Sequence, residues 1–388
     1  FPLFAWLNGD LHAHMLSTPF TLLVAALCYS YWQTPESEIT RRRVMLASIA
    51  PVAGVLAITN TWDLPVAGGL VVLTVAFSPA DPATLLPGSL STSVPRRDGP
   101  TEELRRDGLG LLVGGGVVLA AGLVVAPFWL SSASTRGIGF LPPRSDMGPL
   151  LIVHGGFLLL FVPYLLGRVG NCFDRQRLVG GAVAIGSLAA WAAGFAAIAL
   201  FGPLLLLAWV LLRERVDVGF ETVLVLGGVG LVLLVELIHV VEPRYQTAST
   251  QRLNTVFTMY SQVWILWAPA AGVVAARLVD PTGALAAIDT ARWQSVGTLI
   301  VGIAVVSTGL YAGFAVPAHF DGEPAGADGP TLDGEAYLDE THPNEAAAIE
   351  WLDDRRGQPT IVTAAPGSYR WRPADGKGAS APASITGI

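Results

Sequence analysis

The chain has 388 residues, of which 52% are hydrophobic and only 14% are charged, with a formal net charge of −7. Together with a mean hydropathy of +0.54, this composition excludes a soluble globular protein of this length and predicts a polytopic membrane protein. The chain has no P-loop, no GxGxxG motif and no CxxC pair. The sequence therefore gives no support to a nucleotide site, a zinc finger or a nucleic-acid partner.

The first unusual motif is GDLHAH, which places Asp10, His12 and His14 within five residues just before an apolar run. In an extended loop alternate side chains face the same way, so these three side chains are expected to converge. A carboxylate and two imidazoles suit a divalent metal ion, or general-base chemistry beside a phosphate. The alternative is a polar collar that merely ends an apolar segment.

Ten apolar segments are long enough, or nearly so, to cross a bilayer whose hydrocarbon core is about 30 Å thick. They are 16–32, 44–60, 64–78, 109–130, 150–167, 178–194, 197–212, 221–241, 256–278 and 295–316. The run from 178 to 212 is too long for one crossing, and we expect it to break near Gly202-Pro203. The sequence predicts an all-α polytopic protein with about ten transmembrane helices.

Arginine placement predicts the orientation of these helices in the cell membrane. Arginines crowd into alternate loops, whereas the opposite loops hold only Arg136, Arg144, Arg244 and Arg252. Because basic residues accumulate on the cytoplasmic side, the arginine-rich loops are predicted to face inward. Both ends of this chain are then extracytoplasmic, and GDLHAH shares the outer face with three other polar segments.

Two of these outer segments carry candidate ligand-binding residues. In TNTWDLP, Asn60, Trp62 and Asp63 suit a sugar through hydrogen bonds and ring stacking, although Asp63 equally suits a helix N-cap. The loop 131–148 adds Arg136 and Arg144 in a Gly/Pro-rich setting.

The last outer segment combines acids and arginines around the end of the span 221–241. An acid inside a span is costly and requires a partner or a function. Two arginines flanking a tyrosine match the geometry of a phosphate group. The alternative is a set of ordinary interfacial ion pairs. The candidate residues here are Glu236, Glu242, Arg244, Tyr245, Arg252 and Asn254.

The composition changes after the last span and predicts three regions: a membrane domain over 1–316, a Gly/Pro/acid-rich linker over 317–330 and the start of an extracytoplasmic α/β domain over 331–388. NEAAAIEWLDDRR is predicted to be a helix, and TIVTAAPG (360–367) a strand. The chain opens at Phe1 without a methionine or a signal peptide, and its tail holds too little to bury a core. We therefore expect it to be incomplete at both ends.

Several of these motifs, in this order, resemble the YYY membrane protein family of archaea and some bacteria, a membrane domain of unknown function. They are FPLFAWLNGDLHAHMLSTPF, TNTWDLP, RGIGFLPPRS, QRLNTVFTMYSQVWILWA and THPNEAAAIEWLDDRRGQPTIVTAAPGSY. Its members are similar to GT-C type glycosyltransferases, which use polyprenyl-phosphate sugars and place catalytic groups in outer loops. In those enzymes the first outer loop carries a catalytic acid, which this chain does not show.

The resemblance implies a membrane glycosyltransferase-like activity at the outer face, with a lipid-linked sugar as partner in the bilayer. Asp10 is then the candidate catalytic acid or metal ligand, assisted by His12 and His14. The arginines of the last segment are candidates for the lipid phosphate, and Tyr245 and Asn254 for the sugar. A transporter and a non-catalytic anchor for an outer soluble domain are the alternatives.

Overall fold

We analysed a computed structural model of the chain. It describes residues 2–7, 12–88, 94, 99–131, 137–169, 176–215, 218–241, 247, 251–280, 290–319, 338–339, 342–355, 357, 360–362, 382 and 386. The chain divides into two units, Phe1–Ala312 and Gly313–Ile388.

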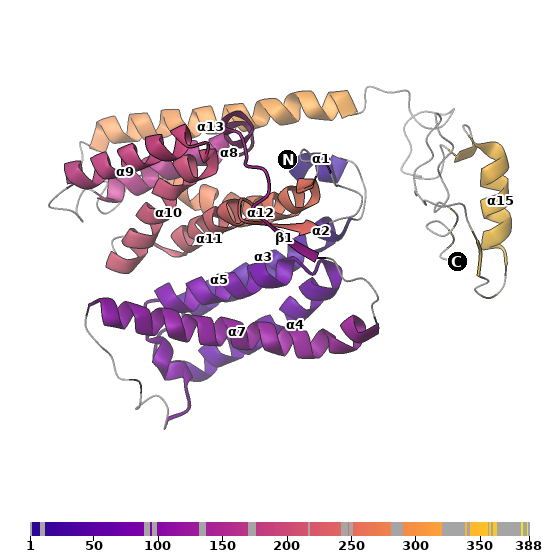
Figure 1. The fold of residues 1–388 in the computed structure, drawn as a ribbon, viewed down its shortest axis with the longest axis horizontal. Coiled ribbons are helices and arrows are strands. Elements are labelled where there is room, and N and C mark those ends of the chain that lie inside the picture. Colours follow the sequence, from indigo (N-terminus) through magenta and orange to yellow (C-terminus); the bar gives the residue numbers. More distant parts are fainter. Residues whose placement is uncertain are drawn as a thin grey trace. The chain divides into compact units, whose positions relative to one another are not determined.

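The first unit is almost entirely helical, as Figure 1 shows. Its helices are α1 (Pro2–Leu7), α2 (Ala13–Leu16), α3 (Thr18–Gln33), α4 (Ile39–Thr59), α5 (Asp63–Phe77), the short 3-10 helix η1 (Pro82–Leu85), α7 (Pro100–Ser131), α8 (Met147–Val169), α9 (Gln176–Ala192), α10 (Ala196–Glu214), α11 (Phe220–Leu234), α12 (Leu253–Val279) and most of α13 (Thr290–His319).

Each of the ten predicted spans overlaps a helix, although the helix in 221–241 ends at Leu234. Among the described residues, seven helices are long and apolar enough to cross a membrane: Ala13–Gln33, Ile39–Thr59, Pro100–Ser131, Met147–Arg168, Ala196–Glu214, Leu253–Val279 and Trp293–His319. The apolar stretches Asp63–Phe77, Gly181–Ala192 and Phe220–Leu234 are shorter. The structure thus confirms a polytopic helical fold with seven candidate spans, and the count of ten stays a prediction.

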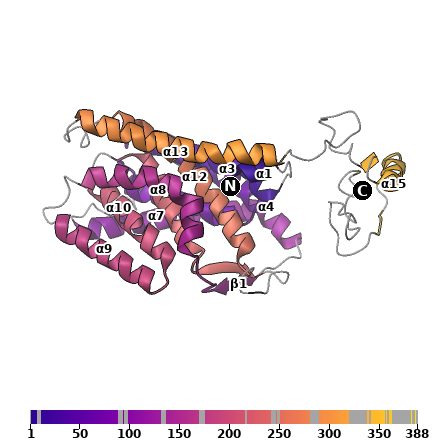
Figure 2. The same ribbon diagram turned by 90° about the horizontal axis from the view of Figure 1, so that it is seen from above.

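The helices pack as two groups that share one core (Figure 1). α3, α4, α5 and α7 form the first group, and α8 to α12 form the second. The groups join where α11 packs against α5 and where α12 packs against α3. Figure 2 shows α13 running alongside α8, in agreement with the close approach of Thr308 to Gly156.

The break in the 178–212 run lies between the predicted spans 178–194 and 197–212, as their bounds require, and not near Gly202-Pro203 as expected. Pro203 lies inside α10, and the chain turns instead at Ala193–Phe195, where Gly194 has a φ of +78°. The amide of Phe195 donates to the carbonyl oxygen of Ala190 at 2.8 Å, which is the glycine-terminated helix end known as a Schellman motif. Proline is tolerated inside membrane helices because neighbouring helices compensate for the lost hydrogen bond, so glycine was the better signal.

The predicted span 221–241 is wrong at its C-terminal end. α11 ends at Leu234, and the following residues form strand β2 (Ile238–Val241). β2 pairs antiparallel with β1 (Gly137–Phe140) from the loop 131–148. The run IHVV favours this strand, because β-branched residues suit extended backbone. The described part of the fold is therefore not purely α-helical.

In the second unit, helix α15 (Pro343–Asp353) coincides with the helix predicted for NEAAAIEWLDDRR. Of the predicted strand 360–367, residues 360–362 are described and are not in a strand. The rest of that strand lies outside the described residues, as does the predicted linker from 320 onward.

Candidate functional site

One end of the helical body carries the β1–β2 ribbon, and we call it the ribbon end. The register pairs Gly139 with His239 and Phe140 with Ile238. The His239 ring lies directly over Gly139, because a Cβ at Gly139 would come within 2.3 Å of that ring. Any other residue there would require the His239 ring to move, so the RGIGFL motif has a steric reason for this glycine. The ribbon ties the loop 131–148 to the segment that follows α11.

A cluster of three side chains fastens the base of this ribbon. The Glu236 carboxylate accepts hydrogen bonds from the Ser145 backbone amide at 3.1 Å and from the Ser145 hydroxyl at 2.6 Å. Arg252 donates to Glu236 at 3.0 Å and to the Ser145 hydroxyl at 2.9 Å. Only 11% of the Glu236 side chain and 14% of the Arg252 side chain are exposed. We call this cluster the Glu236 latch.

The latch corrects the prediction that Glu236 is an acid inside a transmembrane helix. Glu236 follows the end of α11, and its amide donates to the Leu233 carbonyl oxygen in a turn at 3.2 Å. The buried carboxylate is tolerated there because it forms an ion pair with Arg252 and accepts hydrogen bonds from Ser145.

The predicted phosphate clamp of Arg244 and Arg252 is only half described, because Arg244 lies outside the described residues. Arg144 donates to the carbonyl oxygen of Ala193 at 3.0 Å, and its guanidinium lies 3.5 Å from the centre of the Phe195 ring. Arg144 thereby caps the end of α9, and Arg252 is engaged in the latch. Four further candidates, Arg136, Glu242, Arg244 and Tyr245, lie outside the described residues. Asn254 is half-buried in the first turn of α12.

One histidine of GDLHAH, His14, also reaches the first turns of α12. His12 is exposed and extended, whereas His14 lies in α2, so the predicted extended loop is wrong at this position. Their ring centres are 5.5 Å apart, and the His14 ring packs edge-on against Phe257 with a centre distance of 4.8 Å. Asp10 lies outside the described residues. Within the described ranges no cluster of three or more His, Cys, Asp or Glu residues is arranged to hold a metal ion.

Two of the three candidate residues in TNTWDLP, Trp62 and Asp63, point to different places. Trp62 lines a surface pocket, whereas Asp63 is fully buried at the start of α5. The side-chain amide of Asn60 donates to one carboxylate oxygen of Asp63 at 3.0 Å. Asp63 therefore faces the helix bundle, where a ligand in the pocket does not reach it.

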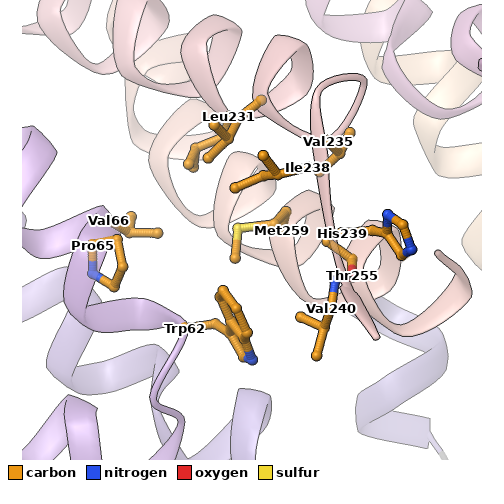
Figure 3. A pocket seen from close by; sticks show the side chains of 11 residues that line it. Trp62, Pro65, Val66, Leu231, Val235, Ile238, His239, Val240, Thr255 and Met259 are labelled. Atoms are coloured by element: carbon orange, nitrogen blue, oxygen red, sulfur yellow. Dashed lines mark hydrogen bonds between the residues drawn. The ribbon is translucent and has the colours of Figure 1, made fainter. Parts of the chain in front are cut away.

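The pocket beside Trp62 lies under the ribbon and has an empty volume of about 480 Å³, including the space at its mouth (Figure 3). Most of its wall is apolar, and only Thr255 and His239 bring polar side chains. The Thr255 hydroxyl accepts a hydrogen bond from the Val240 amide at 2.9 Å, and His239 Nδ1 is buried without a partner. The lining residues are Trp62, Pro65, Val66, Leu231, Leu234, Val235, Ile238, His239, Val240, Thr255 and Met259.

The opposite end of the body, which we call the arginine end, holds buried polar networks that the sequence did not reveal. Arg42 is fully buried and donates to the Tyr31 hydroxyl at 2.5 Å and to the Thr84 hydroxyl at 2.8 Å. Arg105 pairs with Asp81 at 2.9 Å. Arg106 donates to the Ala76 carbonyl oxygen at 2.9 Å. These arginines hold the segment after α5 against α4 and α7.

A second network at this end joins α8, α11 and α12. The Glu221 carboxylate accepts hydrogen bonds from the Tyr164 hydroxyl at 2.5 Å, from Arg277 at 3.0 Å and from the Gly219 amide at 2.8 Å. The positions of arginines in the sequence predict the orientation of the chain in the membrane, but they do not predict which acidic side chain each arginine pairs with. The partners here are separated by up to 113 residues.

Comparison with known proteins gives one match. The family described as uncharacterized membrane protein (DUF2298) matches residues 1–267, and the chain belongs to this family. No curated protein and no solved structure shows significant similarity to the chain. The match covers GDLHAH, TNTWDLP, the ribbon and the first half of α12, and it leaves residues 268–388 unmatched.

Proposed function

We propose that this member of the family is an integral membrane enzyme that binds a lipid-linked phosphosugar at the ribbon end and transfers the sugar to an acceptor. One observation supports this more than any other. Segments far apart in the sequence meet around the first turns of α12: His14 on Phe257, Ser145 on Arg252, and Trp62 in the pocket with Thr255.

The pocket and the latch together suit an amphiphilic ligand. The apolar wall accepts a hydrocarbon chain, because burying apolar surface is favourable by roughly 25 cal/mol per Å². Glu236 and Arg252 belong to the segments that also line the pocket, so a charged headgroup is positioned next to that chain. A lipid that carries a phosphosugar has this division between an apolar and a polar part.

The reaction assigned to this site is a displacement at the anomeric carbon. The acceptor hydroxyl gives its proton to Asp10 and its oxygen bonds to the anomeric carbon, while the bond from that carbon to the phosphate oxygen breaks. The lipid phosphate leaves with the electron pair. His12 and His14 assist Asp10, and a divalent ion at this site would be held by these three side chains and would lower the pKa of the attacking hydroxyl.

In this proposal Arg244 and Arg252, which flank Tyr245 in the sequence, bind the lipid phosphate. Tyr245 and Asn254 contact the sugar. Because Arg252 is bound to Glu236, a phosphate must compete with that carboxylate for the guanidinium. We propose that binding of the headgroup exchanges the Glu236 contact for a phosphate contact, since guanidinium pairs equally well with both anions.

The test uses the full-length gene product in vesicles that contain a radiolabelled polyprenyl-phosphate hexose. Ile238→Trp fills the pocket and is expected to raise the KM for the lipid by about tenfold, a loss of about 1.4 kcal/mol of binding. Leu237→Trp is the matched control, because Leu237 is adjacent, 52% exposed and absent from the pocket wall. Equal kinetics of the two variants contradict the pocket assignment.

The chemistry is tested separately by Asp10→Asn, which is expected to abolish transfer without changing binding of the lipid. Full transfer by this variant rules out Asp10 as the base. Substrate flux across the vesicle membrane without any sugar transfer supports a transporter instead. If GDLHAH is replaced by neutral residues without any effect on cells, a non-catalytic anchor is the better description.

A further inference from the structure

The apolar wall of the pocket continues along one face of the β1–β2 ribbon. Ile238 and Val240 of β2 line the pocket, and Figure 3 shows both side chains on the same side of the strand. The register pairs Ile238 with Phe140 and Val240 with Ile138. Because directly opposed residues of an antiparallel pair share a face of the sheet, all four side chains lie on one face. We call it the apolar ribbon face.

The β2 half of the apolar ribbon face is covered, whereas the β1 half is open. Val240 is 3% exposed, but Phe140 is 74% exposed and Ile138 is 53% exposed. Among the described residues, the pocket wall is built from the starts of α5 and α12, the end of α11 and β2, and it takes none from β1. The face therefore runs from inside the pocket to the surface without a charged side chain. An exposed apolar surface of this kind marks a contact with lipid or with protein.

The pocket lies at the depth of lipid chains and not at the depth of lipid headgroups. Charged side chains avoid the hydrocarbon core, so the paired Glu236 and Arg252 of the latch mark the level of the headgroups. Met259 of the pocket wall lies about 10 Å further along α12 than Arg252, toward the middle of this candidate span. Since Phe140 is paired with Ile238 of the same wall, the open half of the apolar ribbon face lies next to bilayer chains.

We propose that the pocket opens sideways to the leaflet on the ribbon side, and that a lipid of this leaflet passes its hydrocarbon chain into the pocket along the apolar ribbon face. A chain that moves from the bilayer over Phe140 and Ile138 to Ile238 stays in contact with apolar groups throughout. It is never exposed to water, where each methylene group would be unfavourable. The open backbone edges of the ribbon stay at the headgroup level, where water can bind them.

The sideways opening assigns a new role to the loop 131–148, which sequence analysis placed among the polar outer loops. Its strand β1 then contacts lipid chains through Phe140 and Ile138, and its Ser145 fastens the ribbon to the latch. The inference rests on the proposed function only in taking the pocket as the site of a hydrocarbon chain. It does not depend on sugar transfer, on Asp10 or on a metal ion.

The first test measures what surrounds Phe140 in the full-length protein, reconstituted without native cysteines in phosphatidylcholine vesicles. A nitroxide spin label on Phe140→Cys is exposed to oxygen, which concentrates in hydrocarbon, and to a nickel chelate, which stays in water. Leu119→Cys, 65% exposed in the candidate span of α7, is the lipid reference, and Arg41→Cys, with a side chain 62% exposed, is the water reference. We expect the label at Phe140→Cys to match the lipid reference, with a ratio of oxygen to nickel collisions severalfold above that of the water reference.

The second test measures entry of a chain into the pocket. The probe is a dansyl-labelled polyprenyl phosphate without a sugar, supplied in vesicles and followed by energy transfer from the tryptophans of the protein. Phe140→Gln places a polar group on the open half of the face and is expected to slow uptake about tenfold, with the same amount bound at equilibrium. Val241→Gln is the matched control, because Val241 is 45% exposed on the same ribbon but is paired with Gly137 on the opposite face. We expect it to keep the wild-type rate.

The outcomes separate this inference from the proposed function. A label at Phe140→Cys that matches the water reference overturns the sideways opening, and so does a label that neither reagent reaches, because another part of the protein then covers the face. Equal uptake rates of Phe140→Gln and Val241→Gln overturn it as well, while normal binding of the probe leaves the pocket assignment intact. If the wild-type protein does not bind the probe, the pocket assignment and chain entry both fail. If the Phe140 variants do not fold, Ile138→Cys and Ile138→Gln carry the same expectations.

Discussion

Replacing Glu236 with alanine tests whether the latch holds the β1–β2 ribbon in place. The carboxylate accepts two hydrogen bonds from Ser145 and one from Arg252, all between 2.6 and 3.1 Å. Alanine removes both acceptor oxygens, and with them all three hydrogen bonds, and leaves a guanidinium that is only 14% exposed. The amide of Leu141 donates to the Leu237 carbonyl oxygen at 2.8 Å, next to the latch, and reports on whether the ribbon opens.

The magnitude follows from the burial of the pair. Breaking one partner of a buried ion pair costs about 3–5 kcal/mol, and each hydrogen bond to a charged group contributes about 1.5–3 kcal/mol. The latch lies at the end of the body and retains some exposure, so we take the lower limit of about 3 kcal/mol. Glu236→Gln keeps an acceptor for Ser145 and loses only the charge, and we expect about half that cost.

Hydrogen exchange measured by mass spectrometry or NMR gives the free energy of local opening. A cost of about 3 kcal/mol makes the Leu141 amide exchange about 100-fold faster in Glu236→Ala, and about 10-fold faster in Glu236→Gln. Glu38→Ala is the control, because the pair of Glu38 with Arg41 is exposed by 44% and 62%. Such a pair contributes little. A Leu141 exchange rate that stays within threefold of wild type in Glu236→Ala, with the other helices unchanged, refutes the latch.

Three more outcomes follow from packing and orientation. A Cβ added at Gly114 would lie 2.4 Å from a valine side chain of α5, whereas a Cβ added at Gly115 would meet nothing within 4 Å. We therefore expect Gly114→Val to lower the yield of folded protein in detergent and Gly115→Val to leave it unchanged. Tyr164→Phe removes a buried hydroxyl hydrogen bond and is expected to cost about 1–2 kcal/mol, measured as a lower Tm. In a background without native cysteines, Leu141→Cys should react with an impermeant maleimide from outside the cell and Arg43→Cys only after permeabilisation; reaction of both from the same side contradicts the predicted orientation.

Sequence patterns predicted the helices because a bilayer imposes one simple requirement, a run of about 20 apolar residues. These patterns did not predict the structure correctly where an apolar run can form either a helix or a strand. The run from Phe220 to Val241 is apolar apart from Glu221, Thr222, Glu236 and His239, and only its last residues leave the helix to pair with Gly137–Phe140. That choice depends on a partner strand about 100 positions away, and local hydropathy does not contain it.

The sequence indicated several individual residues of the candidate site, but it did not indicate which of them lie next to one another in the structure. Trp62 and Asp63 are adjacent in the sequence and were assigned to one ligand, yet Trp62 faces a pocket and Asp63 is buried in the helix bundle. Helical geometry turns each successive residue by about 100°, so neighbours at a helix start separate at once. The buried Gln262 of α12 gave no signal of its own, because a single glutamine in an apolar helix has no recognisable spacing.

The two ends of the body differ in how their buried polar groups are satisfied. At the arginine end the guanidiniums of Arg105 and Arg106 find protein acceptors, and Arg42 leaves only its Nε without one. At the ribbon end the described residues include buried polar atoms without partners on Asp63, His239 and Gln262. Folding alone selects against such atoms, because each costs about 1–3 kcal/mol. A bound group would offset that cost, and the unpartnered atoms on Asp63, His239 and Gln262 are in keeping with the binding site proposed for the ribbon end.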